Sequence, residues 1–401
     1  MDPIDNPFSP GAGAPPPELV GRDDILNQTT TGIARTKACR SERSRLLTGL
    51  RGVGKTVLLN KIAWIARQQE CITLQMEARE CQSLAEMIAP AVEEALNSLD
   101  KIRGTKDALA KGWKTFKALL GGARIRVSEF EVGFDPTEGN ESRGASVVES
   151  TLPPLIEAAA EAAKERNTSI VILVDEMQYL DIPSLRALIF SLHNTQQKQL
   201  PFYLVGAGLP NLPGLAAEAV SYAERLFLYP VVGPLSQSDT EKALQDPVQK
   251  YNVHFEQEAL DEIFRQTQGY PYFVQEWGSQ SWNLSMGPTI TKSDVRKATL
   301  YATSQLDERF FRARIDRLTP SEKTYLRAMA HIGPGQLRTG DISKVLGRRS
   351  GDLGPTRDKL IKKGMIYSPS HGLLAFTVPL FDEYMKRVMP EFAGSTPGHA
   401  P

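Results

Sequence analysis

Between residues 19 and 235, the chain alternates short apolar runs with longer segments in which apolar residues recur every three or four positions. The first pattern is typical of buried strands, and the second of helices that pack along one side. The predicted strands are Arg45–Thr48, Ile72–Met76, Ile170–Val174, Phe202–Val205 and Leu226–Val231. The helical stretches between them are 55–68, 83–99, 150–165 and 183–196. This alternation predicts an α/β fold with a parallel sheet covered by helices on both faces.

Residues 100–149 interrupt the alternation, because the 119 positions from Thr56 to Asp175 exceed what one helix–strand–helix passage needs. The segment begins with a basic stretch, KIRGTKDALAKGWKTFK. It continues with ARIRVSEFEVGF, in which apolar and polar residues alternate with one slip near Ser128. A slip in a two-residue period indicates a bulge, or a turn between two short strands. We interpret residues 100–149 as an insertion of unknown role.

Changes in composition along the rest of the chain indicate the two terminal segments and the domain boundaries. Residues 1–18 are rich in Pro and Gly and predict a flexible leader, while residues 391–401 are small and polar and predict a disordered tail. A mostly helical segment follows the alternating region. The sequence LTPSEKTYL then predicts a new helix, with Thr319 as N-cap, Pro320 at the first position and Glu322 as the reciprocal cap. The predicted domains are 19–235, 236–316 and 317–390.

The composition limits which cellular compartments and which binding partners are expected. Lys plus Arg and Asp plus Glu both number 47, so any nucleic-acid surface must be local rather than chain-wide. Three cysteines without metal-ligand spacing favour a reducing compartment over a disulfide framework. No apolar run approaches membrane-spanning length, and the N-terminal residues lack a secretion-signal pattern. These features predict a cytoplasmic protein without a membrane partner.

The stretch GLRGVGKT, residues 49–56, matches the pattern G-x-x-x-x-G-K-[ST] between a predicted strand and a predicted helix. In such a loop, glycines let the backbone wrap around phosphate groups, and the helix N-terminus adds a positive dipole. Lys55 is expected to reach the terminal phosphates, and Thr56 to hold Mg²⁺. The predicted nucleotide-binding residues of the loop are Gly49, Leu50, Arg51, Gly52, Val53, Gly54, Lys55 and Thr56.

A second motif, IVILVDE at residues 170–176, ends a predicted buried strand with two carboxylates. Asp175 is expected to bind nucleotide-associated Mg²⁺ together with Thr56, and Glu176 to orient and deprotonate an attacking water. Taken alone, Glu176 would be read as a solvated acid at a strand end. Beside Asp175 and the phosphate loop, it favours hydrolysis of ATP over transfer of phosphate to a small substrate, which leaves a P-loop kinase as the weaker hypothesis.

The two motifs resemble Walker A and Walker B of the AAA+ ATPases and the related STAND ATPases, in particular the origin-recognition-like branch. The resemblance covers roughly residues 19–390 and includes LVGRDDIL at 19–26, DEMQYL at 175–180 and AERLFLYPVVGPLS at 223–236. It implies a P-loop NTPase core of the AAA+ type, followed by a helical lid and a C-terminal winged helix-turn-helix.

Further site residues come only from this resemblance. Arg225 would be an arginine finger or a sensor of the nucleotide state, or else a surface arginine in an ion pair. Gly269 and Pro271, in GYPYFVQEWG, would place backbone and ring against the nucleotide base, or else form an ordinary helix start. The expected catalytic residues are Glu176, Lys55 and Arg225.

Two departures from the family pattern argue against fast, coordinated hydrolysis. Many AAA+ proteins carry a polar sensor at the end of the fourth core strand, whereas this strand ends in GAG at 206–208. The lid also lacks the usual second-sensor arginine and carries Tyr270, Tyr272 and Phe273 there. We therefore expect a slow ATPase that acts as a switch rather than as a processive motor.

The C-terminal segment predicts three helices, at TPSEKTYLRAMA, TGDISKVLG and DLGPTRDKLIKKG, followed by strands at MIYS and LLAFTV. This order resembles a winged helix-turn-helix. Between residues 336 and 365, eight basic residues stand against three acidic ones. The local excess favours binding of double-stranded DNA, although such charges also solvate helix faces and winged helices also dock proteins. The expected DNA-binding residues are Arg348, Arg349, Arg357 and Lys359.

The sequence as a whole predicts an ATP-binding and ATP-hydrolysing switch, with ATP and Mg²⁺ as cofactors, whose nucleotide state controls DNA binding by the C-terminal domain. The alternative is a STAND-like signalling scaffold, in which ATP drives self-association or docking of a protein partner without DNA binding. Steeply salt-dependent DNA affinity favours the first hypothesis. A nucleotide-dependent change in mass without DNA affinity favours the second.

Overall fold

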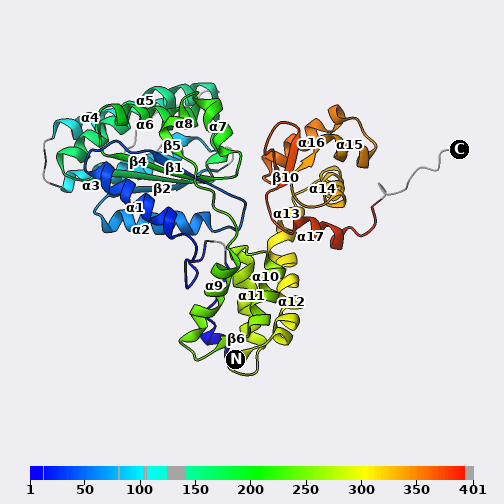
Figure 1. Ribbon diagram of the computed structural model, residues 1–401. Coiled ribbons are helices and arrows are strands. Elements are labelled where there is room, and N and C mark those ends of the chain that lie inside the picture. Colours follow the sequence, from blue (N-terminus) through cyan, green and yellow to red (C-terminus); the bar gives the residue numbers. More distant parts are fainter. Residues whose placement is uncertain (12, 80–81, 103, 105, 124–140, 393–401) are drawn as a thin grey trace. The chain divides into compact units, whose positions relative to one another are not determined.

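The computed structural model describes residues 1–401 except 12, 80–81, 103, 105, 124–140 and 393–401 (Figure 1). The chain forms two compact units, each assembled from separate stretches of sequence. One unit contains residues 22–49 and 55–232, and the other contains residues 1–21, 50–54 and 233–401.

The first unit is built on a sheet of five parallel strands. These are β1 (Ser44–Thr48), β2 (Ile72–Glu77), β3 (Ile170–Asp175), β4 (Phe202–Gly208) and β5 (Phe227–Leu228). Their order across the sheet is β2-β3-β4-β1-β5, so β3, β4 and β1 are interior strands. All residues of β1 and β4 and the five apolar residues of β3 are buried. Burial on both faces explains why β3 and β4 have few polar residues.

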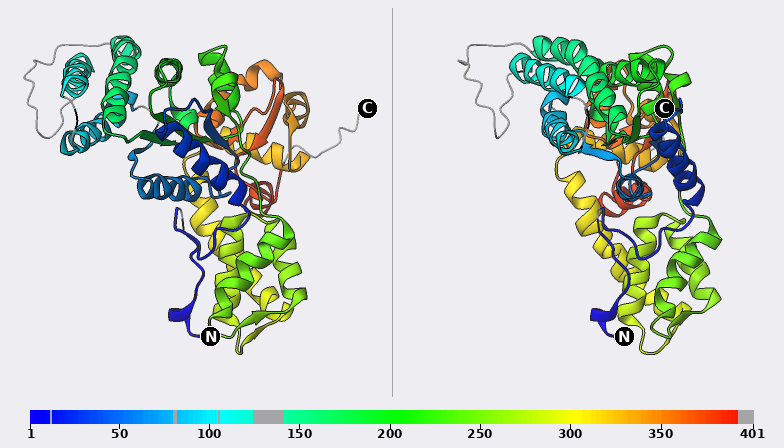
Figure 2. Two further views of the ribbon diagram at one scale, coloured as in Figure 1. Left: turned by 60° about the vertical axis from the view of Figure 1, so that its left-hand side comes forward. Right: turned by 90° about the vertical axis from the view of Figure 1, so that its left-hand side faces the viewer.

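Helices cover both faces of this sheet. They are α1 (Asp23–Lys37), α2 (Lys55–Gln68), α3 (Leu84–Lys101), α4 (Asp107–Ala123), α5 (Glu141–Glu165), α6 (Ile182–Gln197), α7 (Leu212–Ala219) and α8 (Ala223–Leu226), with a 3-10 turn η2 (Met177–Tyr179) after β3. Helices α1 and α2 lie on one face, and α5 and α6 lie on the other (Figure 1 and Figure 2). The predicted α/β fold is therefore confirmed. In the part of the chain that the structure describes, no helix combines the length and apolar character needed to cross a membrane.

One predicted element of this unit differs from the observed one. The strand expected at Leu226–Val231 is only two residues long, because Ala223–Leu226 forms α8 and Pro230 has no amide N–H to pair. Helix α4, within the predicted insertion, packs against α5, and Phe116 of α4 and Leu152 of α5 are buried in the apolar core of the unit. The alternating stretch that predicts two short strands falls outside the described residues.

The second unit contains a mostly helical region. Its elements are α9 (Gln237–Gln249), β6 (His254–Phe255), α10 (Gln257–Thr267), α11 (Pro271–Leu284), β7 (Thr289–Ile290), α12 (Lys292–Gln305), the π-helical turn η3 (Leu306–Phe311) and α13 (Arg312–Ile315). Strands β6 and β7 pair in parallel. A 3-10 turn, η1 (Pro3–Asp5), precedes them in the same unit.

Residues 1–9 pack against this helical region, although their composition predicts a flexible leader. The Asn6 side chain donates to Ser279 Oγ at 3.0 Å, across 273 positions of sequence. Phe8 is 5% exposed, and its ring meets that of Phe255 edge-on with centroids 6.4 Å apart. Distant partners of this kind order the segment, and local composition gives no sign of them.

The C-terminal part of the second unit holds four helices and a small sheet. The helices are α14 (Pro320–Ile332), α15 (Thr339–Leu346), α16 (Ser350–Lys362) and α17 (Phe381–Val388), and the strands are β8 (Leu337–Arg338), β9 (Ile366–Tyr367) and β10 (Leu373–Phe376). The sheet is antiparallel, with order β8-β10-β9. Thr319 and Glu322 cap the start of α14 reciprocally. Strand β8 and helix α17 are additions to the elements that the sequence pattern predicts.

Candidate nucleotide-binding site

The two candidate motifs meet at the carboxyl edge of the sheet. Strands β1 and β3 are parallel members of one sheet, so their carboxyl ends lie on the same edge, where ligands of open α/β sheets bind. Thr56, in the first turn of α2, donates its hydroxyl to Asp175 Oδ2 at 2.6 Å, although 119 positions separate the residues. A hydroxyl and a carboxylate from the two motifs therefore form a single pair of oxygen donors.

The phosphate loop ends in a buried lysine. Helix α2 begins at Lys55, whose Nζ donates to the carbonyl oxygen of Gly49 at 2.9 Å, and the residue is 6% exposed. Gly52 and Gly54 have φ of 85° and 90°, in a region that glycine adopts without strain. Val53, between them, is buried. The loop therefore holds an ammonium group beside a helix N-terminus, and both attract anions.

Residues 50–54 of the loop belong to the second compact unit. Within that unit, the amide N–H of Arg51 donates to the carbonyl oxygen of Thr377 at 3.0 Å. The carbonyl oxygen of Gly52 accepts a hydrogen bond of 3.3 Å from the amide N–H of Tyr272. Both contacts use main-chain atoms, so they depend on the shape of the loop and not on its side chains.

The environment of Asp175 favours a cation. Burial raises the pKa of its carboxyl, while hydrogen bonds from Thr56 and from the Glu176 amide N–H lower it. A buried carboxylate is stabilised in its charged form by a nearby positive charge. Among the described residues, no group of three or more His, Cys, Asp or Glu could hold a metal ion. Thr56 and Asp175 are nevertheless hard oxygen donors of the kind that Mg²⁺ accepts when phosphate and water complete its shell, so the pair fits nucleotide-associated Mg²⁺.

Glu176 stands in an uncommon backbone conformation. Its φ of 51° and ψ of 38° lie in the left-handed region, which non-glycine residues rarely adopt and which often marks functional sites. Its amide N–H donates to Asp175 Oδ1 at 2.8 Å, and its carboxylate accepts a hydrogen bond from the side-chain amide of Gln178. Gln178 was not among the site residues predicted from the sequence, where the available signal was a polar residue two positions after the second acid.

The structure gives positions for the residues that only the family resemblance suggested. Arg225 is exposed on α8, directly before β5. Pro271 lies in the first turn of α11, and Gly269 precedes it with φ of 72°. A Cβ added to Gly269 would overlap the carbonyl oxygen of Leu235, so packing within the second unit requires glycine there. The roles of Arg225 and Pro271 toward a nucleotide stay predictions.

The four predicted DNA-binding residues lie in or directly before α16. Arg348 and Arg349 precede the helix and Lys359 lies on it, and all three are exposed. Arg357 pairs with its neighbour Asp358, with Nη2 and Oδ1 3.0 Å apart. The two arginines lie before the start of the helix and Lys359 lies in its last turn, so the exposed basic side chains are spread along α16.

Lys363, counted among the same basic residues, makes a structural contact. Its Nζ donates to Glu322 Oε2 at 2.7 Å and to the carbonyl oxygen of Arg317 at 3.0 Å. The Glu322 side chain is 2% exposed, whereas that of Lys363 is 36% exposed. Burial raises the pKa of Glu322, but hydrogen bonds from Lys363 and Thr319 outweigh burial and leave this pKa below its ordinary value. At least one of the eight basic residues, Lys363, therefore stabilises the folded domain.

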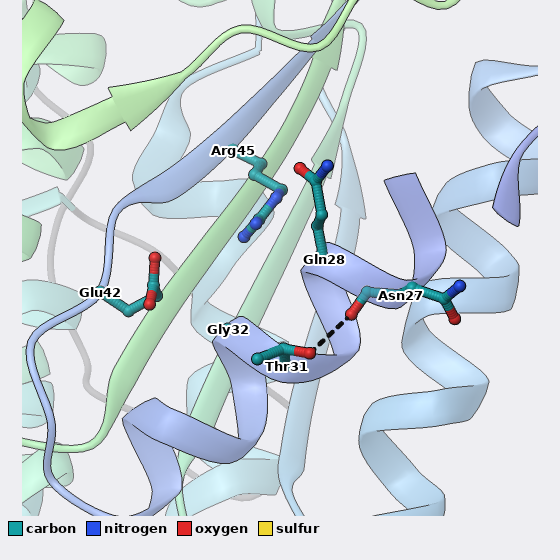
Figure 3. A pocket seen from close by; sticks show the side chains of 6 residues that line it. All are labelled: Asn27, Gln28, Thr31, Gly32, Glu42 and Arg45. Carbon is teal, nitrogen blue, oxygen red and sulfur yellow. Dashed lines mark hydrogen bonds between the residues drawn. The ribbon is translucent and has the colours of Figure 1, made fainter. Parts of the chain in front are cut away.

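A hollow of about 300 Å³ lies near the amino end of β1 (Figure 3). It is lined by Asn27, Gln28, Thr31, Gly32, Glu42 and Arg45. Arg45 is 3% exposed, and its guanidinium donates to the Tyr203 hydroxyl. Burial raises the pKa of Tyr203 to about 12, so the phenol stays neutral. Arg45 is the second residue of β1, whereas the phosphate loop follows the last, so the hollow is separate from the candidate nucleotide site.

Comparison with protein-family models gives two matches. Residues 18–205 match the model described as an AAA ATPase domain, and residues 308–385 match a domain of unknown function (DUF8462). Residues 18–205 are therefore similar to an AAA ATPase domain. A search of curated proteins found no match.

Several solved structures are similar over most of their length. The Walker-type ATPase PABY2304 of Pyrococcus abyssi is 14% identical with a TM-score of 0.56, covering 92% of this chain and 96% of that chain. Cdc6p from Pyrobaculum aerophilum is 16% identical with a TM-score of 0.47, covering 97% and 98%. The Aeropyrum pernix Orc1 protein in complex with DNA is 12% identical with a TM-score of 0.43, covering 94% of each chain. The likeness to the Pyrococcus protein shows the fold alone, and that fold agrees with the predicted α/β core.

Proposed function

We propose that this protein is an ATPase that binds ATP with Mg²⁺ and hydrolyses it slowly. The observation that carries the proposal is the contact between Thr56 and Asp175, which joins the phosphate loop to the end of β3. In this assignment, loop amides other than those of Gly49 and Arg51, which donate to Gly208 and Thr377, bind the phosphates together with the Lys55 ammonium, while Thr56 and Asp175 bind the metal ion. When bound, Mg²⁺ supplies positive charge that stabilises the charge developing on the phosphate oxygens.

In this proposal, Glu176 handles the proton of the attacking water. Its carboxylate accepts a hydrogen bond from the water, directs the water oxygen toward the terminal phosphorus, and takes the proton as the new P–O bond forms. The bond to the ADP oxygen breaks, so ADP and phosphate leave. The end of β4 offers no polar side chain at 206–208, which removes one contact to the reacting groups and supports a low rate of turnover.

We further infer that the C-terminal part is a winged helix that binds double-stranded DNA under the control of the nucleotide. The order of α14, α15, α16 and the β9–β10 pair supports this inference, as do the exposed Arg348, Arg349 and Lys359. In this inference, the arginines directly before α16 and the lysine in its last turn bind backbone phosphates, and the helix itself reads the major groove. Docking of a protein partner through the same surface is the alternative.

The substitution Glu176→Gln tests the proposed hydrolysis. It keeps the size of the side chain but removes the proton acceptor, so we expect kcat to fall by about 100-fold or more while ATP still binds. The measurement is steady-state phosphate release at saturating Mg²⁺-ATP, with equilibrium binding of ATP in parallel. Glu94→Gln, at an exposed acid on α3, is the matched control. Unchanged turnover in Glu176→Gln would refute the role of Glu176.

A further inference from the structure

The end of β4 is shaped by side chains that follow β3. The two strands are paired, with Val174 opposite Gly206. A Cβ added to Gly206 would overlap Met177 Sδ, and a Cβ added to Gly208 would lie 2.7 Å from Gln178 Oε1. The glycines at this strand end therefore leave space that the side chains of Met177 and Gln178 occupy.

The Gln178 side chain uses both ends of its amide group. Oε1 accepts a hydrogen bond of 3.1 Å from the amide N–H of Leu209, the first residue after β4. Nε2 donates to the carboxylate of Glu176. Because a backbone N–H can only donate, the contact with Leu209 fixes which end of the amide is oxygen, and hence which end faces the carboxylate. One side chain consequently ties Glu176 to the end of the neighbouring strand.

We propose that Gln178 is the positioning residue for Glu176 in ATP hydrolysis, an inference that rests on the function proposed above. An amide N–H on one carboxylate oxygen orients the carboxylate without neutralising its charge, so Glu176 keeps its capacity to accept a proton. The bond to Leu209 sets that orientation relative to β4, which lies between β3 and β1. Gln178 therefore gives Glu176 a polar contact beside a strand end that has no polar side chain of its own at residues 206–208.

The first test is steady-state ATP hydrolysis by Gln178→Ala. Displacing a catalytic group slightly lowers turnover by about 10- to 100-fold, so we expect kcat to fall in this range while KM and the affinity for ADP stay unchanged. Gly208→Ala is a second variant that keeps the amide but places a Cβ against Gln178 Oε1. It should lower kcat in the same way, and thermal unfolding identifies any variant that fails to fold. Unchanged kcat in folded Gln178→Ala overturns the proposal.

A double substitution separates positioning from a general structural effect. If Gln178 acts through Glu176, Gln178→Ala should lower kcat no further in a Glu176→Gln background. An equal fold-loss in both backgrounds overturns the proposal. The role proposed for Glu176 has its own test. If Glu176 is not the catalytic base, Glu176→Gln alone retains full turnover. A large loss in Glu176→Gln with none in Gln178→Ala would leave the proposed function standing and reject only the role of Gln178.

Discussion

Two regions of the molecule differ in what their charged residues contact. At the carboxyl edge of the five-stranded sheet these residues contact one another, whereas around α16 most of them face solvent. At the sheet edge, polar groups contact one another: Thr56 bonds to Asp175, and Lys55 bonds to a loop carbonyl. Around α16, side chains such as Arg348 are exposed, and the arginine that does pair, Arg357, pairs with its own neighbour. Side chains that contact one another form a site with a specific ligand geometry. An exposed basic surface indicates only that its partner is negatively charged.

The difference also determines how each region responds to substitution. A mutually bonded set depends on each member, because removal of one leaves its partners without compensation. An exposed set acts through the sum of its charges, so each member contributes little and its effect is screened by salt. Substitutions at the sheet edge should therefore have large single effects, and those around α16 small and additive ones.

The largest effect is expected from Lys55→Ala. The buried ammonium is the only protein charge that the proposal assigns to the phosphates, and loss of such a charge-assisted contact weakens binding by about 100-fold or more. Titration calorimetry with a non-hydrolysable ATP analogue and Mg²⁺ measures the change. Lys61→Ala, at an exposed lysine of the same helix, is the control and should bind as the unaltered protein does. Equal affinities for the two variants would place the nucleotide elsewhere.

A smaller effect, on stability, is expected from Lys363→Ala. The substitution leaves the buried Glu322 carboxylate without its lysine, and we expect a loss of about 2 kcal/mol, reduced from a fully buried case because Lys363 is 36% exposed. Chemical denaturation measures it, with Lys362→Ala as the neighbouring control.

The same pair predicts a pH dependence. The folded-state pKa of Glu322 is lowered, so its contribution is present at pH values above the ordinary carboxyl pKa and is lost as pH falls through the lowered one. The stability difference between Lys363→Ala and the unaltered protein should therefore shrink in acid. A difference that is constant with pH would contradict an ionic contribution of the pair.

The smallest effect is expected from Arg348→Ala combined with Arg349→Ala. Affinity for random-sequence duplex DNA should fall by about 10-fold, and the salt slope by about 2, as two phosphate contacts are lost. The assay is fluorescence anisotropy at two salt concentrations, with Mg²⁺-ATP, with Mg²⁺-ADP and without nucleotide. Arg296→Ala with Lys297→Ala, an exposed basic pair on α12, is the matched control. Absence of DNA binding in every state would make the surface a protein-docking site.

The sheet was predictable because its signals are local. Apolar runs such as that of β3 report burial on both faces, and the helix predicted at 55–68 has the observed limits of α2. The identity of the two motifs also indicated that Thr56 and Asp175 would serve one site, and the structure places them in contact. Such features depend on periodicity and on residue types at fixed offsets, which a single sequence displays directly.

The missed features depend on which segments become neighbours. Gln178 reaches Leu209 only because β3 and β4 are adjacent in the sheet, an order that strand patterns do not specify. Strand β8 has two residues and is recognisable only through its pairing with β10. The family resemblance indicated that residues 206–208 lack a polar side chain. It could not indicate that Gln178 lies beside them, because that contact depends on which strands are adjacent.

The packing of residues 1–9 has a consequence for the order in which the chain can fold as it is synthesised. Phe8 fits against Gly278 so closely that a Cβ on the glycine would lie 2.7 Å from the ring. These residues are about 270 positions apart, so at about 5–20 residues per second Phe8 leaves the ribosome roughly 15–55 s before its partner. All of residues 22–232 emerge within that interval. A chain that stops before Gly278 leaves the Phe8 ring without the surface on which it packs, and this ring is then exposed to chaperones and to other nascent chains.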